Sequence, residues 1–295
     1  MADGDRETIG LHAQLACVWE ATARKPGNVH RYADFDDLNY LDFIAAAAAV
    51  APVLARSPDR RVGRTVLDGV RAARRVTSTN ANLGILLLLA PLTKAAAEAD
   101  FRSGLDRVLD ELDVEDARLV YEAIRLANPG GLGRSADQDI RDAPTRPLRE
   151  VMALAAHRDG IARQYANGFR EVFDDGAPAV LEGMERTGSM EGAIIRTHLH
   201  LMARHPDTLI ARKRGPIEAA ESARRARAVL DAGWPHAPAS REAFAEFDAW
   251  LRADGRRRNP GTTADLIAAC LFVLLREGRI ILPYSRWHCN YGSLV

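Results

Sequence analysis

The sequence has few cysteines, no long apolar run and no excess of charge of either sign. Its three cysteines, Cys17, Cys270 and Cys289, lie far apart and are odd in number. This pattern argues against a disulfide framework and lacks the spacing of a zinc site. Forty basic residues balance forty acidic residues, so no overall charge draws the chain to nucleic acid or to an anionic membrane. We therefore expect a cytoplasmic protein that binds neither.

Membrane-spanning and β-strand patterns are also lacking. No stretch reaches the roughly 18 to 20 apolar residues that a spanning helix needs. The first ten residues, MADGDRETIG, are polar and acidic, unlike a signal peptide, and we expect residues 1–6 to be flexible. Ile280–Leu282 is the one run that resembles a strand. These absences leave helices as the main structural element.

Helical periodicity fills most of the remaining length. The apolar fraction of 47% and the charged fraction of 27% are those of an ordinary globular protein. The spacing predicts helices over Glu7–Arg24, Leu38–Leu54, Val62–Val76, Val114–Leu126, Ile217–Ala232 and Arg241–Ala253, with a polar connection near Asp100–Gly104. No linker divides the chain. We predict one all-α domain over residues 1–295, built as a multi-helix globular bundle.

The stretch Thr77–Leu92, TSTNANLGILLLLAPL, turns abruptly from small polar residues to an unbroken apolar run. Ser, Thr and Asn favour helix starts, and a helix that is apolar all round belongs in a core. We expect a buried helix whose N-terminus, lined by Asn80, Asn82 and Gly84, opens into a cleft. The free N–H groups there favour a phosphate or carboxylate. The alternative is that the asparagines merely cap a core helix.

A second stretch repeats this design near the end of the chain. Asn259–Asp265 is polar and contains glycine, and the apolar run LIAACLFVLL follows it. Asp265 falls in the first turn of the predicted helix. The sequence therefore predicts two buried central helices with a polar cleft at their N-termini.

Acidic residues before helices and in one glycine-rich loop are candidate Mg²⁺ ligands. Asp37 precedes the second helix, and the loop after Asn128 carries Arg134, Asp137 and Asp139. Mg²⁺ favours a few carboxylates together with water and substrate phosphate oxygens. The same aspartates also suit helix capping or a solvated surface, so both interpretations stay open.

Five segments, taken together, resemble the triphosphoribosyl-dephospho-coenzyme A synthase family. They are Glu20 with KPGNV at 25–29, TNANLG at 79–84, REVMALAAHRDGI at 149–161, DTLIARKRG at 207–215 and NPGTTADLIAACLF at 259–272. Their order and approximate spacing match over most of the chain. The resemblance implies an all-α enzyme that joins ATP to dephospho-coenzyme A and expels adenine.

The resemblance also implies roles for individual residues, because substitution at a ribose carbon needs an anchored polyphosphate, a carboxylate and a proton for the leaving base. The candidate catalytic residues are Glu20, Asp37 and Asp265; the candidate phosphate-binding residues are Lys25, Asn28, Asn80, Asn82, Gly84, Arg134, Arg149 and Arg212; the candidate Mg²⁺ ligands are Asp37, Asp137, Asp139 and Asp265. Glu20 is the candidate base. ATP is the expected nucleotide substrate, and a homodimer is left open.

One motif departs from the family pattern. Where the typical family sequence resembles GxNTHKGxIF, this chain has TNANLGILL, so Asn82 and Leu83 replace a His and a Lys. This form resembles a branch associated with tetrahydromethanopterin-linked one-carbon metabolism. It leaves two alternatives: transfer to another acceptor, such as a pterin or furan cofactor precursor, or a helical binding protein without turnover.

Overall fold

The computed structural model describes residues 3–79, 81–130, 133 and 137–287. Its α-helices are α1 (Asp3–Thr22), α2 (Tyr40–Leu54), α3 (Val62–Ala73), α4 (Leu83–Ala95), α5 (Phe101–Asp110), α6 (Val114–Ala127), α7 (Leu148–Ala155), α8 (Gly160–Asn167), α9 (Ala177–Thr187), α10 (Met190–Arg204), α11 (Thr208–Arg214), α12 (Pro216–Asp231), α13 (Pro238–Arg252) and α14 (Gly261–Arg276). A short 3₁₀ helix, η1 (Ser57–Asp59), and a π-helical turn, η2 (Glu171–Gly176), complete them. The predicted all-α fold is confirmed.

The chain is helical from Asp3, residues 1–2 lie outside the described part, and the flexibility of residues 1–6 stays a prediction. Two other local predictions were wrong. Asp100–Gly104 is not a polar connection, because Asp100 accepts a hydrogen bond from the Ser103 N–H and thereby caps α5. Ile280–Leu282 is not a strand either, whereas Ala253–Arg256 forms the short extended segment β1.

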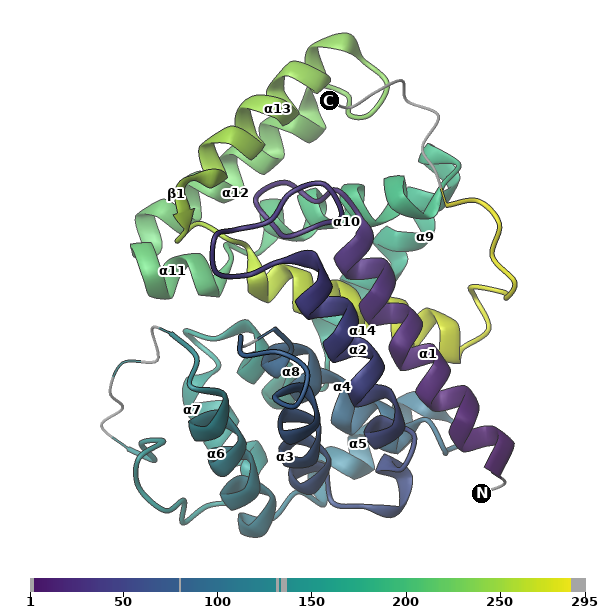
Figure 1. The fold of residues 1–295 in the computed structure, drawn as a ribbon, viewed down its shortest axis with the longest axis vertical. Coiled ribbons are helices and arrows are strands. Elements are labelled where there is room, and N and C mark those ends of the chain that lie inside the picture. Colours follow the sequence, from purple (N-terminus) through teal and green to yellow (C-terminus); the bar gives the residue numbers. More distant parts are fainter. Residues whose placement is uncertain (1–2, 80, 131–132, 134–136, 288–295) are drawn as a thin grey trace.

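The two buried central helices are present as predicted. In α4, Gly84 and Lys94 are the only residues that are not buried, and in α14 the run Thr262–Leu275 is buried except at Asp265. Figure 1 shows α14 crossing the middle of the molecule, with α3, α6, α7 and α8 on one side and α11, α12 and α13 on the other. The central helices pack against each other.

Two hydrophobic clusters meet at α10. The larger one joins α1–α9 to α14, and the smaller one lies among α10, α11, α12 and α13. Ile194 of α10 belongs to the larger cluster, and its neighbour Ile195 belongs to the smaller. Because α10 contributes to both clusters, the two clusters pack on a common helix. That the chain forms a single domain stays a prediction. Within the described residues, no helix is long and apolar enough to cross a bilayer.

Candidate active site

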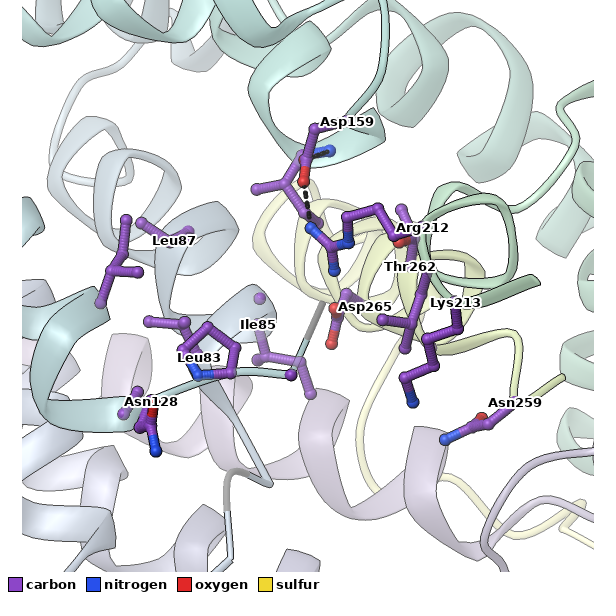
Figure 2. Close-up of a pocket in the computed structure, with 18 of the residues that line it drawn as sticks. Leu83, Ile85, Leu87, Asn128, Asp159, Arg212, Lys213, Asn259, Thr262 and Asp265 are labelled. Carbon is purple, nitrogen blue, oxygen red and sulfur yellow. Dashed lines mark hydrogen bonds and ion pairs between the residues drawn. The ribbon is translucent and has the colours of Figure 1, made fainter. Parts of the chain in front are cut away.

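A cavity of about 1850 Å³ opens where the N-termini of α4, α8, α11 and α14 come together. Figure 2 shows Asp265 and Thr262 of α14 between the apolar side chains of α4 and the cations of α11. Pockets for single small molecules are usually about 300–1,000 Å³. The cavity is therefore large enough for two substrates of nucleotide size, and the predicted polar cleft is confirmed.

Two aspartates, the half-buried Asp159 and the buried Asp207, tie these helix ends together. Asp159 caps α8 by accepting hydrogen bonds from the N–H groups of Ile161 and Ala162. Asp207 caps α11 and also accepts from the backbone N–H and the hydroxyl of Thr263, both at 2.8 Å. A helix start leaves several N–H groups without intrahelical partners, and these carboxylates satisfy them. Asp207 thereby fixes α11 against the first turn of α14.

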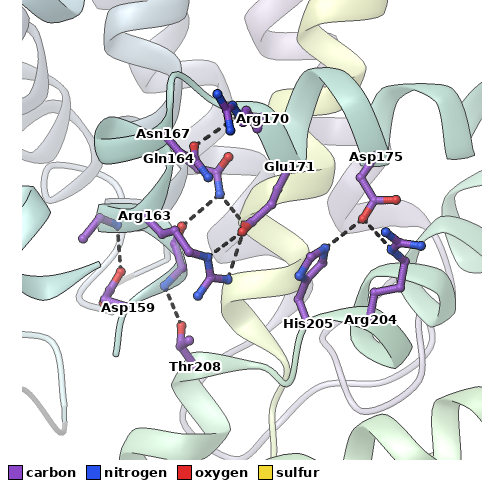
Figure 3. A network of polar contacts seen from close by, with 12 residues as sticks. Asp159, Arg163, Gln164, Asn167, Arg170, Glu171, Asp175, Arg204, His205 and Thr208 are labelled. Carbon is purple, nitrogen blue, oxygen red and sulfur yellow. Dashed lines mark hydrogen bonds and ion pairs between the residues drawn. The ribbon is translucent and has the colours of Figure 1, made fainter. Parts of the chain in front are cut away.

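Threonine hydroxyls extend the same connection to α8. The Thr208 hydroxyl accepts from the Gly160 N–H at 3.0 Å and donates to the Thr262 hydroxyl at 3.0 Å. Figure 3 shows the bond from α8 to Thr208 beside a second set, in which Arg163 and Gln164 of α8 hold Glu171 of η2. The starts of three helices are consequently held at one place. Their backbone dipoles favour negative charge in the cavity.

The carboxylate of Asp265 lines the cavity at the start of α14. It is partly buried in the wall, and no described residue forms a hydrogen bond or an ion pair with it. Burial raises the pKa of Asp265 well above its ordinary value, and the nearby charges of Glu20 and Asp207 raise it further. A carboxylate left without a partner in such a place is typical of a functional group rather than a structural one.

Gly84, in the first turn of α4, makes room for this carboxylate. A Cβ atom at position 84 would collide with Oδ2 of Asp265. The absence of a side chain therefore lets the α14 carboxylate lie directly against the start of α4. This contact explains why glycine follows the polar residues in the first of the two matching stretches.

Cations from α11 and β1 form the wall opposite α4. Arg212 places Nη1 2.6 Å from Oδ2 of Asp159, while its buried Nε has no partner. Lys213 donates to the Arg256 carbonyl at 3.2 Å, and burial lowers the pKa of its ammonium, with the charge of Arg256 adding to the shift. These groups keep donors for an anion. Asn28 and Asn259 lie nearby, joined by a 2.8 Å hydrogen bond.

Comparison with known proteins identifies the family of this chain. Residues 6–281 match the family model described as ATP:dephospho-CoA triphosphoribosyl transferase. The chain belongs to this transferase family. A Pseudomonas syringae pv. syringae protein named "Probable 2-(5''-triphosphoribosyl)-3'-dephosphocoenzyme-A synthase" is 30% identical over 242 residues, which cover 78% of this chain and 72% of that protein. A Klebsiella pneumoniae synthase of the same type is 32% identical over 124 residues, covering 42% of this chain and 40% of that protein.

A solved structure supports the same assignment. A crystal structure from Archaeoglobus fulgidus, assigned as a triphosphoribosyl-dephospho-CoA synthase, superposes with a TM-score of 0.63 at 27% identity. The match covers 80% of this chain and 99% of that chain. The sequence resemblance to the synthase family is therefore confirmed.

Lys25 of the transferase does not reach the cavity, against the prediction that it binds phosphate. Its side chain is fully buried, with Nζ 2.9 Å from Oε1 of Glu20 and hydrogen bonds to the carbonyls of Glu20 and Ala23. Burial lowers the pKa of Lys25 and raises that of Glu20, and their mutual attraction opposes both shifts. The ammonium has used its donors inside the protein. Glu20 lines the cavity, but it is 1% exposed and faces this cation.

Two further candidate phosphate ligands, Arg149 and Asn82, do not line the cavity. Arg149 does not line the cavity, because its guanidinium pairs with Asp110 and donates to the Tyr165 carbonyl. Asn82 lies at the start of α4 but makes no capping bond, and its amide is 2% exposed without a partner. Asn82 is also absent from the cavity wall, whereas Leu83 belongs to it. Asn80 and Arg134 lie outside the described residues.

The four predicted Mg²⁺ ligands all line the cavity but do not form one cluster. Asp37 pairs with Arg256 at 2.7 Å, Asp137 with Arg146 at 2.9 Å and Asp139 with Arg141 at 2.7 Å; Asp265 is the fourth. In the part of the chain that the structure describes, no group of three Asp, Glu, His or Cys side chains could hold a metal ion. Three of the four candidate carboxylates are paired with arginines, so their role as Mg²⁺ ligands stays a prediction.

The sequence also missed the roles of several residues that build the site. The sequence indicates that a helix begins at Pro206–Thr208, but it gives Asp159 no capping role, although helical residues follow it as they follow Asp207. The capping signal was available, but the second partners, Arg212 and Thr263, come from other parts of the chain. Lys213 and Asn259 were likewise recognised only as motif members.

The contact between Gly84 and Asp265 leads to a direct test. In Gly84→Ala, the added methyl group should displace the carboxylate and lower turnover of ATP with dephospho-CoA about 100-fold, because small misplacements of reacting groups have effects of that size. Gly4→Ala is the matched control, since Gly4 is an exposed helical glycine with nothing near its Cβ position. Full turnover by Gly84→Ala would show that the position of Asp265 is unimportant.

Proposed function

We propose that this transferase moves the triphosphoribosyl group of ATP to 3'-dephospho-CoA and releases adenine. The observation that carries the proposal is an unpartnered carboxylate, Asp265, set between helix N-termini and a wall of cations in a cavity of about 1850 Å³. The family model and the named relatives support the same reaction. A cavity built for one small metabolite would need neither this volume nor two chemically different walls.

The reaction joins a ribose hydroxyl oxygen of dephospho-CoA to C1′ of the ATP ribose and breaks the bond from C1′ to adenine. The hydroxyl loses a proton, and adenine leaves with one, so no other reactant is needed. Positive charge develops on the ribose as the base departs, and a negative group beside it stabilises the transition state. Asp265 is the residue we assign to this position, because it is a partly buried carboxylate of the wall to which no described residue bonds.

Arg212 and Lys213 are the residues we assign to the triphosphate. Both line the cavity from α11, and Arg212 keeps an unbonded Nε while Asp159 fixes its other end. A guanidinium held in this way presents its donors without losing rotamer freedom when the anion binds. Arg252 extends the cationic wall, where its guanidinium is fixed by Asp248 and the Asn28 carbonyl.

We further propose that Mg²⁺ accompanies the triphosphate. The available donors fit an ion held mostly by phosphate oxygens and water, because Asp265 alone among the four predicted ligands is not paired with an arginine. Mg²⁺ commonly uses only one or two protein carboxylates at such sites. When bound, the ion would neutralise part of the triphosphate charge.

The variant motif TNANLG at 79–84 bears on the identity of the acceptor substrate. Leu83 lines the cavity where the family pattern has a lysine, so this wall of the cavity has lost a cation. Because of this change, a second acceptor should be tested beside dephospho-CoA. The candidate is a pterin or furan precursor of a cofactor of one-carbon metabolism.

Adenine release tests the proposed reaction. We expect the protein to form free adenine from ATP only when dephospho-CoA and Mg²⁺ are also present, as measured by chromatography of the products. A pterin acceptor in place of dephospho-CoA serves as the comparison. If adenine formed only with the pterin, the acceptor would be the pterin and not dephospho-CoA. If no adenine formed with either acceptor, the proposed transfer reaction would be contradicted.

Arg212 and Arg149 form a matched pair for testing the triphosphate site. Arg212→Gln should raise the KM for ATP about 10- to 100-fold, because losing a hydrogen bond to a charged group weakens binding by about that factor. Arg149→Gln makes the same chemical change outside the cavity and should leave the KM for ATP unchanged. Initial rates at saturating dephospho-CoA give both values. Equal effects in the two variants would remove Arg212 from the binding site.

Asp265→Asn should abolish turnover and at the same time stabilise the protein near neutral pH. The folded-state pKa of Asp265 is raised above the unfolded value, so its ionisation destabilises the fold as the pH rises through the folded-state pKa. Below the unfolded pKa of about 3.9 this effect is absent. The gain in melting temperature of the variant over wild type should be largest near pH 8 and shrink toward pH 4. Each kcal/mol gained in the free energy of unfolding should raise the melting temperature by about 2 to 4 °C. A variant that is less stable than wild type at pH 8 would contradict the raised pKa.

A further inference from the structure

The cavity has two chemically different arms. One arm, which we call the apolar arm, lies among α4, α6, α7 and α8 and is lined by Leu83, Leu87, Ile124, Leu148, Val151 and Met152. The other arm is the cationic wall with Arg212 and Lys213. Figure 2 shows Leu83, Ile85 and Leu87 on the side of Asp265 away from Arg212 and Lys213. Asp265 therefore stands at the junction of the two arms.

The walls of the apolar arm are mostly aliphatic, and Asn128 is the polar side chain that Figure 2 labels beside Leu83. Leu87, Val151 and Met152 are buried but keep 7%, 9% and 8% of their surface exposed. The Tyr121 hydroxyl also lies there, but it already donates to the Gln138 carbonyl at 2.5 Å. A ligand group that needs several hydrogen bonds would lose most of those it has in water on entering this arm.

The charged groups near the apolar arm do not suit a polyphosphate. Asp137 and Asp139 line the cavity from the segment that follows α6, and they already hold the guanidinium groups of Arg146 and Arg141, so these arginines are not free for a phosphate. Arg74 also lines the cavity, but its guanidinium donates to the Leu126 carbonyl at 3.0 Å. Arg158, at the turn between α7 and α8, is exposed. The triphosphate of ATP is therefore expected in the cationic arm rather than here.

We propose that the apolar arm holds the pantetheine chain of dephospho-CoA. This inference rests on the proposed function, which requires two substrates to meet at Asp265. Of the uncharged parts of those substrates, adenine carries hydrogen-bonding atoms around most of its edge, more than the one amide side chain of Asn128 can satisfy. Pantetheine is a long chain whose methylene groups and dimethyl branch are buried favourably against leucine and methionine side chains. Its two amides are spaced along the chain, so one of them can bond to Asn128 while the other stays at the mouth of the arm. With the chain in this arm, the ribose of dephospho-CoA lies toward Asp265, and the triphosphate of ATP approaches from the opposite side.

The arrangement also gives a basis for choosing the acceptor. ADP carries the same adenosine and diphosphate as dephospho-CoA but lacks pantetheine. If the apolar arm supplies binding energy through the chain, wild-type protein should bind dephospho-CoA more tightly than ADP at the acceptor site. Contacts made by the chain in the ground state and the transition state alike should appear mainly in KM.

The test removes apolar surface from the arm and compares the two substrates. Met152→Ala should weaken dephospho-CoA binding and raise its KM about fivefold or more, since each buried methylene contributes about 0.8 kcal/mol. The KM for ATP should change less than about twofold. Ile124→Ala, at a less buried residue of α6, repeats the test if Met152→Ala folds poorly. Met184→Ala is the matched control, because Met184 packs against the core outside the cavity wall.

Each result has a distinct meaning. A fall in the preference for dephospho-CoA over ADP, measured by calorimetric titration, supports the assignment. A raised KM for ATP with dephospho-CoA unchanged would overturn it and place the nucleotide base in the arm. Unchanged values for both substrates in Met152→Ala and Ile124→Ala would show that neither substrate occupies the arm. Failure of the proposed function itself is seen separately, as wild-type protein that forms no adenine with dephospho-CoA.

Discussion

The structure depends on one close approach, in which the carboxylate of Asp265 in α14 lies against Gly84 at the start of α4. Both helices are apolar almost all round, so they are held in the core by burial and cannot shift independently. Their N-termini therefore meet at a fixed place inside the protein. A carboxylate at that place is unfavourable for stability, and no described residue pairs with it, a combination that is common at functional sites.

The remaining helix starts are arranged around this point by shared capping residues. Asp207 satisfies N–H groups of α11 and α14 together, and Asp159 caps α8 while it fixes Arg212. A single substitution at either aspartate would thus disturb two elements. The same bonds that complete the helix ends also aim a cation into the cavity, so stability and substrate binding rest on the same few contacts. The cavity they enclose has one cationic and one apolar side, with Asp265 between them.

The sequence predicted the parts of this arrangement that are local. Both buried helices could be recognised because a polar, glycine-containing segment precedes an apolar run in each, and Asp265 falls at a position that faces the cleft. Lys25 could not be assigned correctly, since a lysine in a polar loop gives no sign that Glu20 and two carbonyls will enclose it. Arg149 failed for a related reason: its partner Asp110 lies in α5, a helix that the pattern did not predict. Pairing between distant charges is decided by the fold, and the family resemblance supplied the reaction that spacing alone left open.

The most direct measurement is a crystal structure of the protein with ATP, Mg²⁺ and dephospho-CoA bound. The account predicts that C1′ of the ATP ribose contacts the Asp265 carboxylate, with the triphosphate on Arg212 and Lys213 and the acceptor ribose on the side of Leu83. A structure in which the triphosphate binds elsewhere and Asp265 touches neither substrate would contradict it.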